Sequence, residues 1–511
     1  MRASLTKRDG FRLRAWQAGL VVVIVATAFG MTRSGASWGA SGYDSTSDPY
    51  SMQNITAADG AQAWWKAGYT GQGVDVALID TGVSPVAGLS VPGKVVDGPD
   101  LSLESQNPSL SHLDTNGHGT FMAGLIAGDD GQSGGYRGVA PGARILSVKV
   151  GDADGGVDVS QVIAAIDWVV QHRHDNGMDI RVINLSYGTN STQAYTVDPL
   201  AYAVEQAWKA GIVVVAAAGN SGYQRGASAQ GLADPAYDPE ILAVGAADTM
   251  GTGKSSDDEV ASFSATAASC SKACRAPDLV APGTHMQGLR VPGSYIDQNN
   301  PAGVLGDSYF RGSGTSEATA FVSGAVALLL QKYPDLTPDQ VKAMLTTSCA
   351  RLHGYNLKEQ GCGELDLNRL LPMHEVPLLS ANQYLARWGA SALSTGTGSL
   401  EASRGTDHVS FNGTELQGEQ DIFGMPFDSA AMAALEASGS SWSGGMWNGS
   451  LWTGSSWSGS SWSGSSWSGS GWPGSSWSGS SWSGSSWPGN SWSGSSWSGS
   501  SWSGSSWSGS S

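Results

Sequence analysis

The sequence is poor in cysteine, in charged side chains and especially in basic ones. Its 511 residues include four cysteines, no two of them in a C-x-x-C arrangement, so we expect no structural zinc site. Only 14% of the residues are charged, and 44 acidic against 27 basic side chains give a net charge of -17. This balance argues against nucleic acid as a partner, because phosphates attract lysine and arginine.

Long apolar runs are also scarce. The run near the N-terminus, residues 18–31, follows a basic stretch at 7–14 and precedes the small residues 34–36. These features in this order are typical of a signal peptide, and the run is shorter than the ~20 residues of a membrane-spanning helix. We therefore predict a signal peptide over 1–36 and a secreted or cell-surface protein. An uncleaved N-terminal anchor is the alternative interpretation.

An even number of cysteines in an exported chain favours two disulfides. Four cysteines allow three pairings. We expect Cys270 to pair with Cys274 and Cys349 with Cys362, because each of these bonds closes a short loop. Free buried thiols are the alternative.

Residues 48–370 alternate strand-like apolar runs with helical patterns. The runs are rich in valine and isoleucine and apolar on both faces, as in a parallel sheet covered by helices. They span 74–80, 144–150, 181–188, 212–220 and 241–248, and helical spacing occupies 159–176 and 200–210. This alternation predicts an α/β fold with a doubly wound, mostly parallel sheet and helices on both faces.

The remainder of the chain differs in composition. Residues 371–440 hold short apolar fragments and are expected to be a connecting region with some structure. Residues 441–511 repeat an uncharged five-residue unit close to SSWSG, with tryptophan at every fifth position. A period of five fits neither helix nor strand, and the glycine and serine content predicts a flexible tail. Tryptophan rings can stack on sugars, so a cell-surface glycan is a candidate partner; a tail without a ligand is the alternative.

Three short segments carry the residue types of nucleophilic catalysis. Asp80 ends an apolar run, at the position where α/β sheets place their active sites. His118 and Ser316 each lie in a glycine-containing segment that opens an apolar helical run. A serine hydroxyl needs a base to remove its proton, a histidine can do so near neutral pH, and a carboxylate orients the histidine.

On these residues, the chain resembles the subtilisin-like (subtilase, S8) peptidase family. The aspartate motif matches residues 77–82, the histidine motif 117–120 and 123–124, and the serine motif 314–316 and 318–319, while 138–143 and 280–283 match two further segments. The order Asp, His, Ser is also that of subtilisin. The resemblance implies a serine endopeptidase that hydrolyses polypeptides through an acyl-enzyme and needs no cofactor for its chemistry. We expect a monomer.

The resemblance also assigns roles to individual residues. Ser316 would attack, His118 would act as base and then acid, and Asp80 would orient the histidine. Asn220 would help to hold the oxyanion together with the backbone N–H of Ser316. Substrate backbone and the P1 side chain would meet Ser186, Tyr187, Gly188, Ala217, Ala218 and Gly219. The tyrosine and the alanines favour an apolar P1 side chain.

The motifs admit other interpretations. Asp-Thr-Gly also occurs in aspartic proteases, but those need two carboxylates that share a proton, and no second Asp-Thr-Gly is present. A surface or cell-wall binding protein with a silent or secondary protease domain stays open as the alternative function.

Three features depart from the family or leave its properties open. Glu317 follows Ser316 where many relatives have methionine, and a carboxylate there would raise the pKa of His118. Relatives often bind structural calcium, for which Asp97, Asp100 and Asp114 are plausible oxygen ligands, but no EF-hand spacing occurs and no ligand set is assigned. We expect no pro-domain, because only a short stretch separates the predicted signal peptide, which ends at 36, from the expected catalytic domain, which begins at 48.

Overall fold

The computed structural model describes residues 42–105, 107, 109–132, 134–222, 231–267, 274–373, 392–411, 414–452, 482–486, 493–497 and 506–507. The predicted signal peptide, Cys270 and most of the tryptophan repeat lie outside these residues. Within them, no helix combines the length and the apolar character that crossing a bilayer requires.

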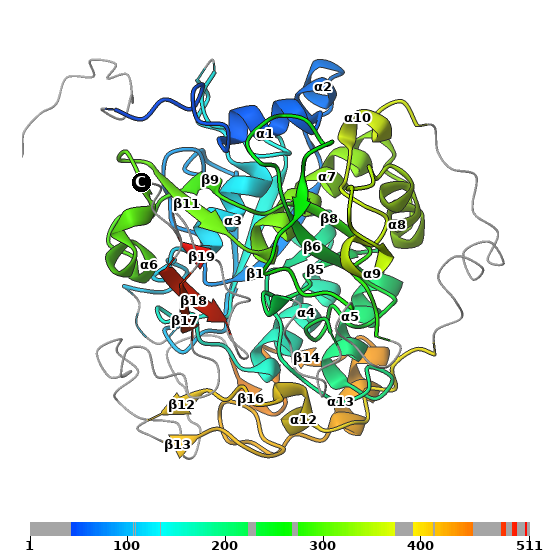
Figure 1. Ribbon diagram of the computed structural model, residues 1–511. Helices are drawn as coiled ribbons and strands as arrows, with labels where there is room; N and C mark the ends of the chain where they lie inside the picture. The colour runs from blue at the N-terminus through cyan, green and yellow to red at the C-terminus, as the bar shows by residue number, and fades with distance from the viewer. Residues whose placement is uncertain are drawn as a thin grey trace, which may run out of the picture. The chain divides into compact units, whose positions relative to one another are not determined.

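The central sheet is built around β1 (Asp75–Asp80), which is buried at every position. The strand order is β2-β3-β1-β4-β5-β6-β7, with β8 beside β6 (Figure 1). The other strands are β2 (Val95–Asp100), β3 (Arg144–Lys149), β4 (Ile180–Leu185), β5 (Val213–Ala217), β6 (Leu242–Asp248), β7 (Glu259–Val260) and β8 (Leu279–Pro282). All pairs are parallel except that of β6 with β7, which confirms the doubly wound sheet.

The strand order places a topological switch point beside β1. The chain adds β2 and β3 on one side of β1 and then β4, β5 and β6 on the other. In open α/β sheets, ligands bind at the carboxyl ends of the strands at such a point. Asp80 is the last residue of β1 and therefore lies at this position.

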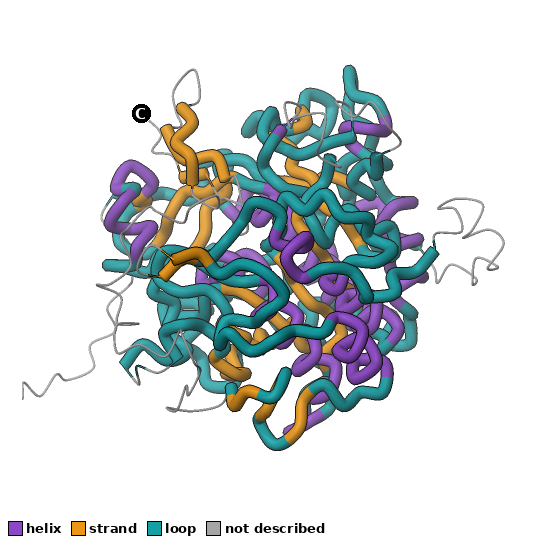
Figure 2. Tube along the Cα trace, turned by 90° about the horizontal axis from the view of Figure 1, so that it is seen from below, coloured by secondary structure: helices purple, strands orange, loops and turns teal. Residues whose placement is uncertain are grey.

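Helices cover the sheet. α3 (His118–Ala127) packs against α7 (Thr315–Lys332), and α4 (Val159–His172) packs against α5 (Pro199–Lys209). α7 is buried along almost its whole length and contacts β4, β5, β6 and β8. Seen from below, helical segments lie on both sides of the central strands (Figure 2).

Shorter elements complete the described residues. The helices are α1 (Met52–Ala58), α2 (Ala61–Lys66), α6 (Tyr295–Asn299), α8 (Pro338–Thr347), α9 (Leu357–Gln360), α10 (Leu367–Leu370), α12 (Leu400–Arg404) and α13 (Ser429–Ala437). The small strands are β9 (Met286–Leu289), β10 (Val304–Leu305), β11 (Tyr309–Ser313), β12 (Ser410–Phe411), β13 (Thr414–Glu415), β14 (Trp442–Ser443), β15 (Met446–Trp447), β16 (Ser450–Leu451), β17 (Trp482–Ser486), β18 (Ser493–Trp497) and β19 (Ser506–Trp507). β11 pairs with β9, β10 and β19 and leads directly into α7.

The segment 392–452 is folded onto the outer helices of the sheet. α12 and β14 contact α4, and α13 contacts α5, as the yellow and orange ribbon in Figure 1 shows. The buried Arg404 donates from Nε to Asp158 Oδ2 at 2.6 Å, and Asp158 in turn caps the N-terminus of α4. The described part of the connecting region is therefore an integral layer of the protein.

The start of the tryptophan repeat is part of the same layer. Trp442, Trp447 and Trp452 are buried, and the first two donate to the carbonyl of Ala164 and the carboxylate of Asp167, both on α4. The structure thus differs over 441–452 from the flexible tail that composition predicted. Glycine-containing tight turns at 444–445 and 448–449 fold these residues into a three-stranded sheet that the period of five did not reveal.

Cys349 and Cys362 form the expected disulfide, with Cα atoms 5.8 Å apart. The bond joins the end of α8 to the residues after α9. Because Cys270 lies outside the described residues, its pairing with Cys274 stays a prediction.

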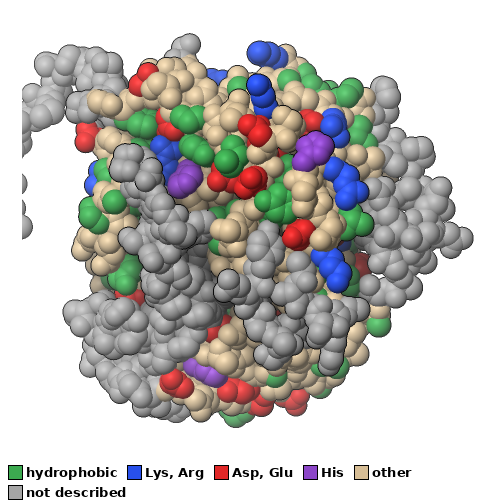
Figure 3. All heavy atoms as spheres, viewed as in Figure 1, with side chains coloured by type: hydrophobic (Ala, Val, Ile, Leu, Met, Phe, Trp, Pro, Cys, Tyr) green, Lys and Arg blue, Asp and Glu red, His purple; other side chains and the backbone are tan. Residues whose placement is uncertain are grey.

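Charged side chains are spread thinly over the surface. On the described part of the face in Figure 3, acidic and basic side chains are interspersed among uncharged polar groups and backbone. This distribution agrees with the low charged fraction of the sequence.

We predict that Arg404→Met destabilises the protein by about 3–5 kcal/mol, because it leaves the buried carboxylate of Asp158 without its counter-charge. Urea unfolding of the full chain in a Ser316→Ala background, which prevents self-digestion, measures the loss. Arg137→Met is the control, since its ion pair with Asp129 is partly exposed and contributes at most about 1 kcal/mol. Equal losses in both variants would contradict a stabilising role for the segment 392–452.

Candidate active site

Asp80 and His118 form a buried pair at the switch point. Asp80 ends β1 and His118 is the first residue of α3. His118 Nδ1 lies 2.8 Å from Asp80 Oδ1 and 3.1 Å from Oδ2. A carboxylate at this distance holds the proton on Nδ1, so Nε2 becomes the basic nitrogen of the ring.

Two glycines let α3 approach β1 this closely. Gly117, at the start of α3, has a φ of 106°, a conformation that favours glycine. A Cβ at Gly119 would lie 2.1 Å from the carbonyl oxygen of Gly82. The glycines on either side of His118 therefore serve the geometry of the pair, which explains their presence in the motif.

A third carboxylate, that of Asp114, ties the end of β1 to the first turn of α3. Its Oδ1 accepts from Thr81 Oγ1 at 2.8 Å and from the backbone of Gly117 at 2.7 Å, and its Oδ2 accepts from the backbone of Thr120 at 2.7 Å. Thr81 Oγ1 also accepts from the backbone of Gly119. Asp114 thereby fixes the position of His118 relative to the strand that carries Asp80.

This role of Asp114 was not predicted from the sequence. Asp114 was considered there with Asp97 and Asp100 as a plausible calcium ligand, but Asp97 is exposed and Asp100 accepts from Ser102 and from the backbone of His112. With both oxygens of Asp114 taken by protein donors, the structure does not bring the three together as a site. The signal for its role was an aspartate just before a helix, where carboxylates accept from the first free N–H groups.

Ser316 is the second residue of α7 and is fully buried. Its carbonyl oxygen accepts from Ser186 Oγ at 3.2 Å. Asn220 is anchored to the same turn, because its Oδ1 accepts from the backbone N–H of Thr315 at 2.9 Å and from the Thr315 hydroxyl at 3.0 Å. These two contacts fix which end of the amide is the acceptor: the oxygen faces Thr315, and the N–H₂ group forms the donor end of Asn220.

The environment of His118 favours its protonated form. Burial alone would lower its pKa, but the charge and hydrogen bond of Asp80 outweigh burial, and Glu317 and Asp114 add to them, so that the pKa of His118 is raised overall. Glu317 is itself fully buried in the first turn of α7. Its influence has the direction expected from the sequence.

The residues expected to meet substrate lie at the ends of two adjacent strands. The first three follow β4 and the others end or follow β5, which pairs with β4 in parallel. All six are buried: Ser186, Tyr187, Gly188, Ala217, Ala218 and Gly219. Burial raises the pKa of Tyr187, and the charges of Asp158 and Asp234 raise it further, so its phenol lies near charged groups. An apolar P1 wall therefore depends on the alanines.

We predict that Asp114→Ala lowers kcat about 10- to 100-fold, because the first turn of α3 loses the contact that positions His118. KM should change little, since these contacts of Asp114 are with Thr81 and the first turn of α3 and not with the residues expected to meet substrate. Steady-state kinetics on a peptide substrate measure both constants, with thermal unfolding to show that the variant is folded. The control is the exposed Asp97→Ala, and a matching loss there would contradict a specific positioning role.

We predict that Glu317→Gln moves the acid limb of the kcat/KM profile to lower pH. A neutral His118 is the active form, and removing a nearby negative charge lowers its pKa. Initial rates between pH 5 and 9 measure the shift. A pH profile of Glu317→Gln that coincides with that of the parent would rule out direct electrostatic coupling between Glu317 and His118. An equal shift in the distant Glu359→Gln would do the same.

A buried aspartate–histidine pair and a serine at a helix N-terminus, in the chain order Asp, His, Ser on a doubly wound sheet, define a class of serine-type hydrolases. The sequence model of the subtilase family matches residues 71–364, and the chain belongs to this family. It is therefore a serine-type endopeptidase. The family match ends before the segment 392–452.

Two relatives from Bacillus match the chain over the family domain. Serine protease AprX of Bacillus subtilis is 38% identical over 307 residues, which is 59% of this chain and 67% of that protein. Subtilisin DY of Bacillus licheniformis is 36% identical over 305 residues, 60% of this chain and 92% of that protein. A solved structure of a cold adapted subtilisin-like serine proteinase has 30% identity and a TM-score of 0.43, covering 58% of this chain and 88% of that chain.

Proposed function

We propose that this chain is a secreted endopeptidase that cleaves polypeptides through an acyl-enzyme on Ser316, with His118 as base and Asp80 as its orienting carboxylate. The observation that carries the proposal is the buried contact of 2.8 Å between His118 Nδ1 and Asp80 Oδ1, at the start of the helix α3 that packs against α7, whose first turn bears Ser316. Secretion rests on the signal peptide predicted over 1–36.

In the acylation step, the Oγ of Ser316 attacks the scissile carbonyl carbon while His118 Nε2 takes its proton. Asp80 stabilises the imidazolium that forms, and burial of the pair strengthens this interaction. The carbonyl oxygen gains negative charge and accepts from the backbone N–H of Ser316 and from the amide of Asn220. Because Thr315 anchors the Asn220 oxygen, this donor is already oriented before substrate binds.

The first tetrahedral intermediate then collapses to the acyl-enzyme. His118 gives its proton to the leaving amine as the scissile C–N bond breaks, the amine departs and makes room for water, and the acyl group stays on Ser316. The water loses a proton to His118 Nε2 as it attacks the acyl carbon, and Ser316 recovers its proton when the second intermediate collapses. No other group of the chain is needed to move a proton in either half of the reaction.

Substrate backbone would align beside residues 186–188 by strand addition, with the P1 side chain directed towards residues 217–219. The small alanines there favour an apolar P1 residue. For the alternative of glycan binding by the tryptophan repeat, the first three rings are not available, because Trp442, Trp447 and Trp452 are buried against the protein.

Casein hydrolysis by the full chain, beside Ser316→Ala and with a serine-directed covalent inhibitor, tests the proposal. We expect the inhibitor and the substitution each to abolish activity, and mass spectrometry to find one inhibitor adduct on the Ser316 peptide. Ser323→Ala is the control on the same helix. Activity that survives Ser316→Ala would overturn the assigned nucleophile, and an inactive parent that also fails to react with the inhibitor would favour the silent-domain alternative.

A further inference from the structure

Ala233 and Asp234 join the two segments that are expected to meet substrate. The backbone of Asp234 exchanges two hydrogen bonds with the backbone of Thr189, of 2.9 and 3.0 Å. The N–H group of Ala233 donates to the carbonyl of Ala218 at 2.9 Å. One short stretch of chain therefore holds the residues that follow β4 and those that follow β5.

The junction is tightly packed. A Cβ at Gly188 would lie 2.7 Å from the Cβ of Ala233 and 3.1 Å from the carbonyl oxygen of Asp234, and a Cβ at Gly219 would lie 3.3 Å from the Cβ of Ala233. A close-packed interior transmits a displacement to its neighbours because it has little free space to absorb it. A shift of Ala233 and Asp234 would therefore move both segments.

The side chain of Asp234 is buried beside a second carboxyl group, that of Asp198. Asp234 is 1% exposed, and among the described residues no N–H or hydroxyl group donates to either of its oxygens. Asp198, which caps the N-terminus of α5, lies within hydrogen-bonding reach of Asp234. Two carboxylates at such a distance cannot both ionise in a buried site, so the pair holds a proton.

The proton resides on Asp234, because Asp198 is surrounded by donors. Asp198 Oδ1 accepts from two backbone N–H groups in the first turn of α5, at 2.8 and 3.2 Å. Its Oδ2 accepts from Ser403 Oγ at 2.6 Å and from Gln193 Nε2 at 2.8 Å. Hydrogen bonds of this kind favour the ionised form of a carboxyl group. Asp234 has none of them and serves as a donor to Asp198.

The charges around Asp234 also favour its neutral form. Burial raises the pKa of Asp234 well above its usual range, and the charges of Asp198 and Asp238 raise it further. Burial raises the pKa of Asp238 to about 7. The phenols of Tyr187 and Tyr237 also face Asp234, and burial together with its charge raises the pKa of both. In the described part of the chain, no basic side chain offsets the charges at Asp234.

We propose that Asp234 is a positioning residue: its protonated carboxyl group donates to Asp198 and holds the two substrate-binding segments in place, and loss of this proton at alkaline pH weakens substrate binding. The inference rests on the proposed function, in which residues 186–188 and 217–219 align the substrate. An ionised Asp234 would be repelled by Asp198 at short range in a buried site. None of these contacts involves a group that acts in the proposed mechanism, so the chemical step should persist.

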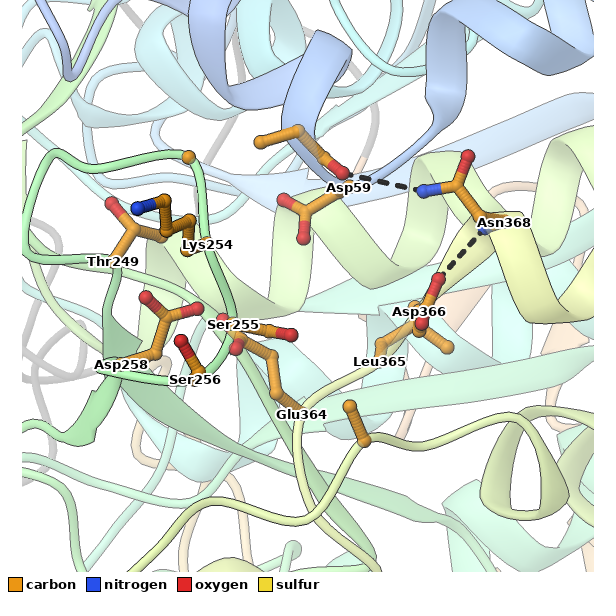
Figure 4. A pocket seen from close by; sticks show the side chains of 13 residues that line it. Asp59, Thr249, Lys254, Ser255, Ser256, Asp258, Glu364, Leu365, Asp366 and Asn368 are labelled. Carbon is orange, nitrogen blue, oxygen red and sulfur yellow. Dashed lines mark hydrogen bonds between the residues drawn. The ribbon is translucent and has the colours of Figure 1, made fainter.

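A second pair of buried carboxyl groups provides a comparison. Asp258 and Glu364 lie within hydrogen-bonding reach of each other, and Figure 4 shows them with Asp59 around a common cavity. Glu364 is 1% exposed, as Asp234 is, and burial raises its pKa. Because this pair lies outside the segments expected to meet substrate, a substitution there should leave substrate binding unchanged.

The test compares Asp234→Asn, whose amide donates to Asp198 but cannot ionise, with Asp234→Ala, which has no donor. The full chain of each variant hydrolyses a chromogenic tetrapeptide substrate between pH 7 and 10.5. Once Asp234 ionises in the parent, we expect KM to rise up to about tenfold per pH unit, since apparent affinity falls with the fraction of competent enzyme. KM of Asp234→Asn should stay flat, and KM of Asp234→Ala should be raised at every pH. In all three chains kcat should change little.

Two controls make the comparison specific. Glu364→Gln neutralises the other pair and should reproduce the KM profile of the parent. Lys342, whose pKa is lowered by burial to about 8, changes its charge in the same range in every variant, so its effect cancels. Binding of a fluorescent peptide to the same chains in a Ser316→Ala background gives a Kd without turnover. A failure of this inference is thereby distinguished from a failure of the proposed catalysis, and thermal unfolding shows that each variant is folded.

Three results would overturn the inference. An alkaline rise in KM and Kd that persists in Asp234→Asn would place the titrating group elsewhere. A KM of folded Asp234→Ala equal to that of the parent at neutral pH would show that the contact with Asp198 does not position the segments. A parent whose KM and Kd stay flat up to pH 10.5 would show that substrate binding does not depend on this proton.

Discussion

The geometry of the active site depends on how the end of β1 is joined to the start of α3. A strand and a helix that contribute one residue each to a pair 2.8 Å apart must be fixed to within a few tenths of an ångström. The carboxylate of Asp114 does this by accepting from Thr81 on one side and from the helix backbone on the other. The contact is buried, where water does not compete for the same donors, and the absence of a side chain at Gly119 leaves the space for it. The pair of Asp80 and His118 is thus held by a third carboxylate, which the proposed mechanism does not use.

Buried carboxylates are stabilised in three different ways in this chain. Asp114 is surrounded by backbone and hydroxyl donors at a helix N-terminus. Asp158 has the guanidinium of Arg404, which lowers its pKa against the effect of burial. Glu364 has neither, although it is as deeply buried as the other two. Its neutral form is favoured instead, because burial and the charge of Asp59 both raise the pKa of Glu364.

Much of the fold and of the site could be predicted from the sequence, because the signals are local. Apolar runs on both faces marked the parallel strands, and the glycine-flanked His118 and Ser316 marked helix starts beside a strand end. Asp114 was misjudged as a calcium candidate because its role appears only when Thr81 and the turn of α3 come together in space. Arg404 gave no signal at all, since its partner Asp158 lies 246 positions earlier. The burial of Trp447 was missed for the same reason, because a period of five says nothing about a distant surface such as α4.

The C-terminal segment links stability to the substrate-binding edge. Thr189 follows the expected binding residues directly, and its hydroxyl donates to the carbonyl of Ser403 at 2.5 Å, while the backbone N–H of Asn190 donates to Asp407 at 3.1 Å. These contacts come from the same turn that places Arg404 against Asp158 at the start of α4. A change that loosens the segment from α4 would therefore also release the residues after Tyr187, beside which the proposed function aligns the substrate. The family match stops at residue 364, so this support comes from residues outside the matched range. It gives the chain a way to tune binding at the edge of the site without altering any residue that touches the reacting atoms.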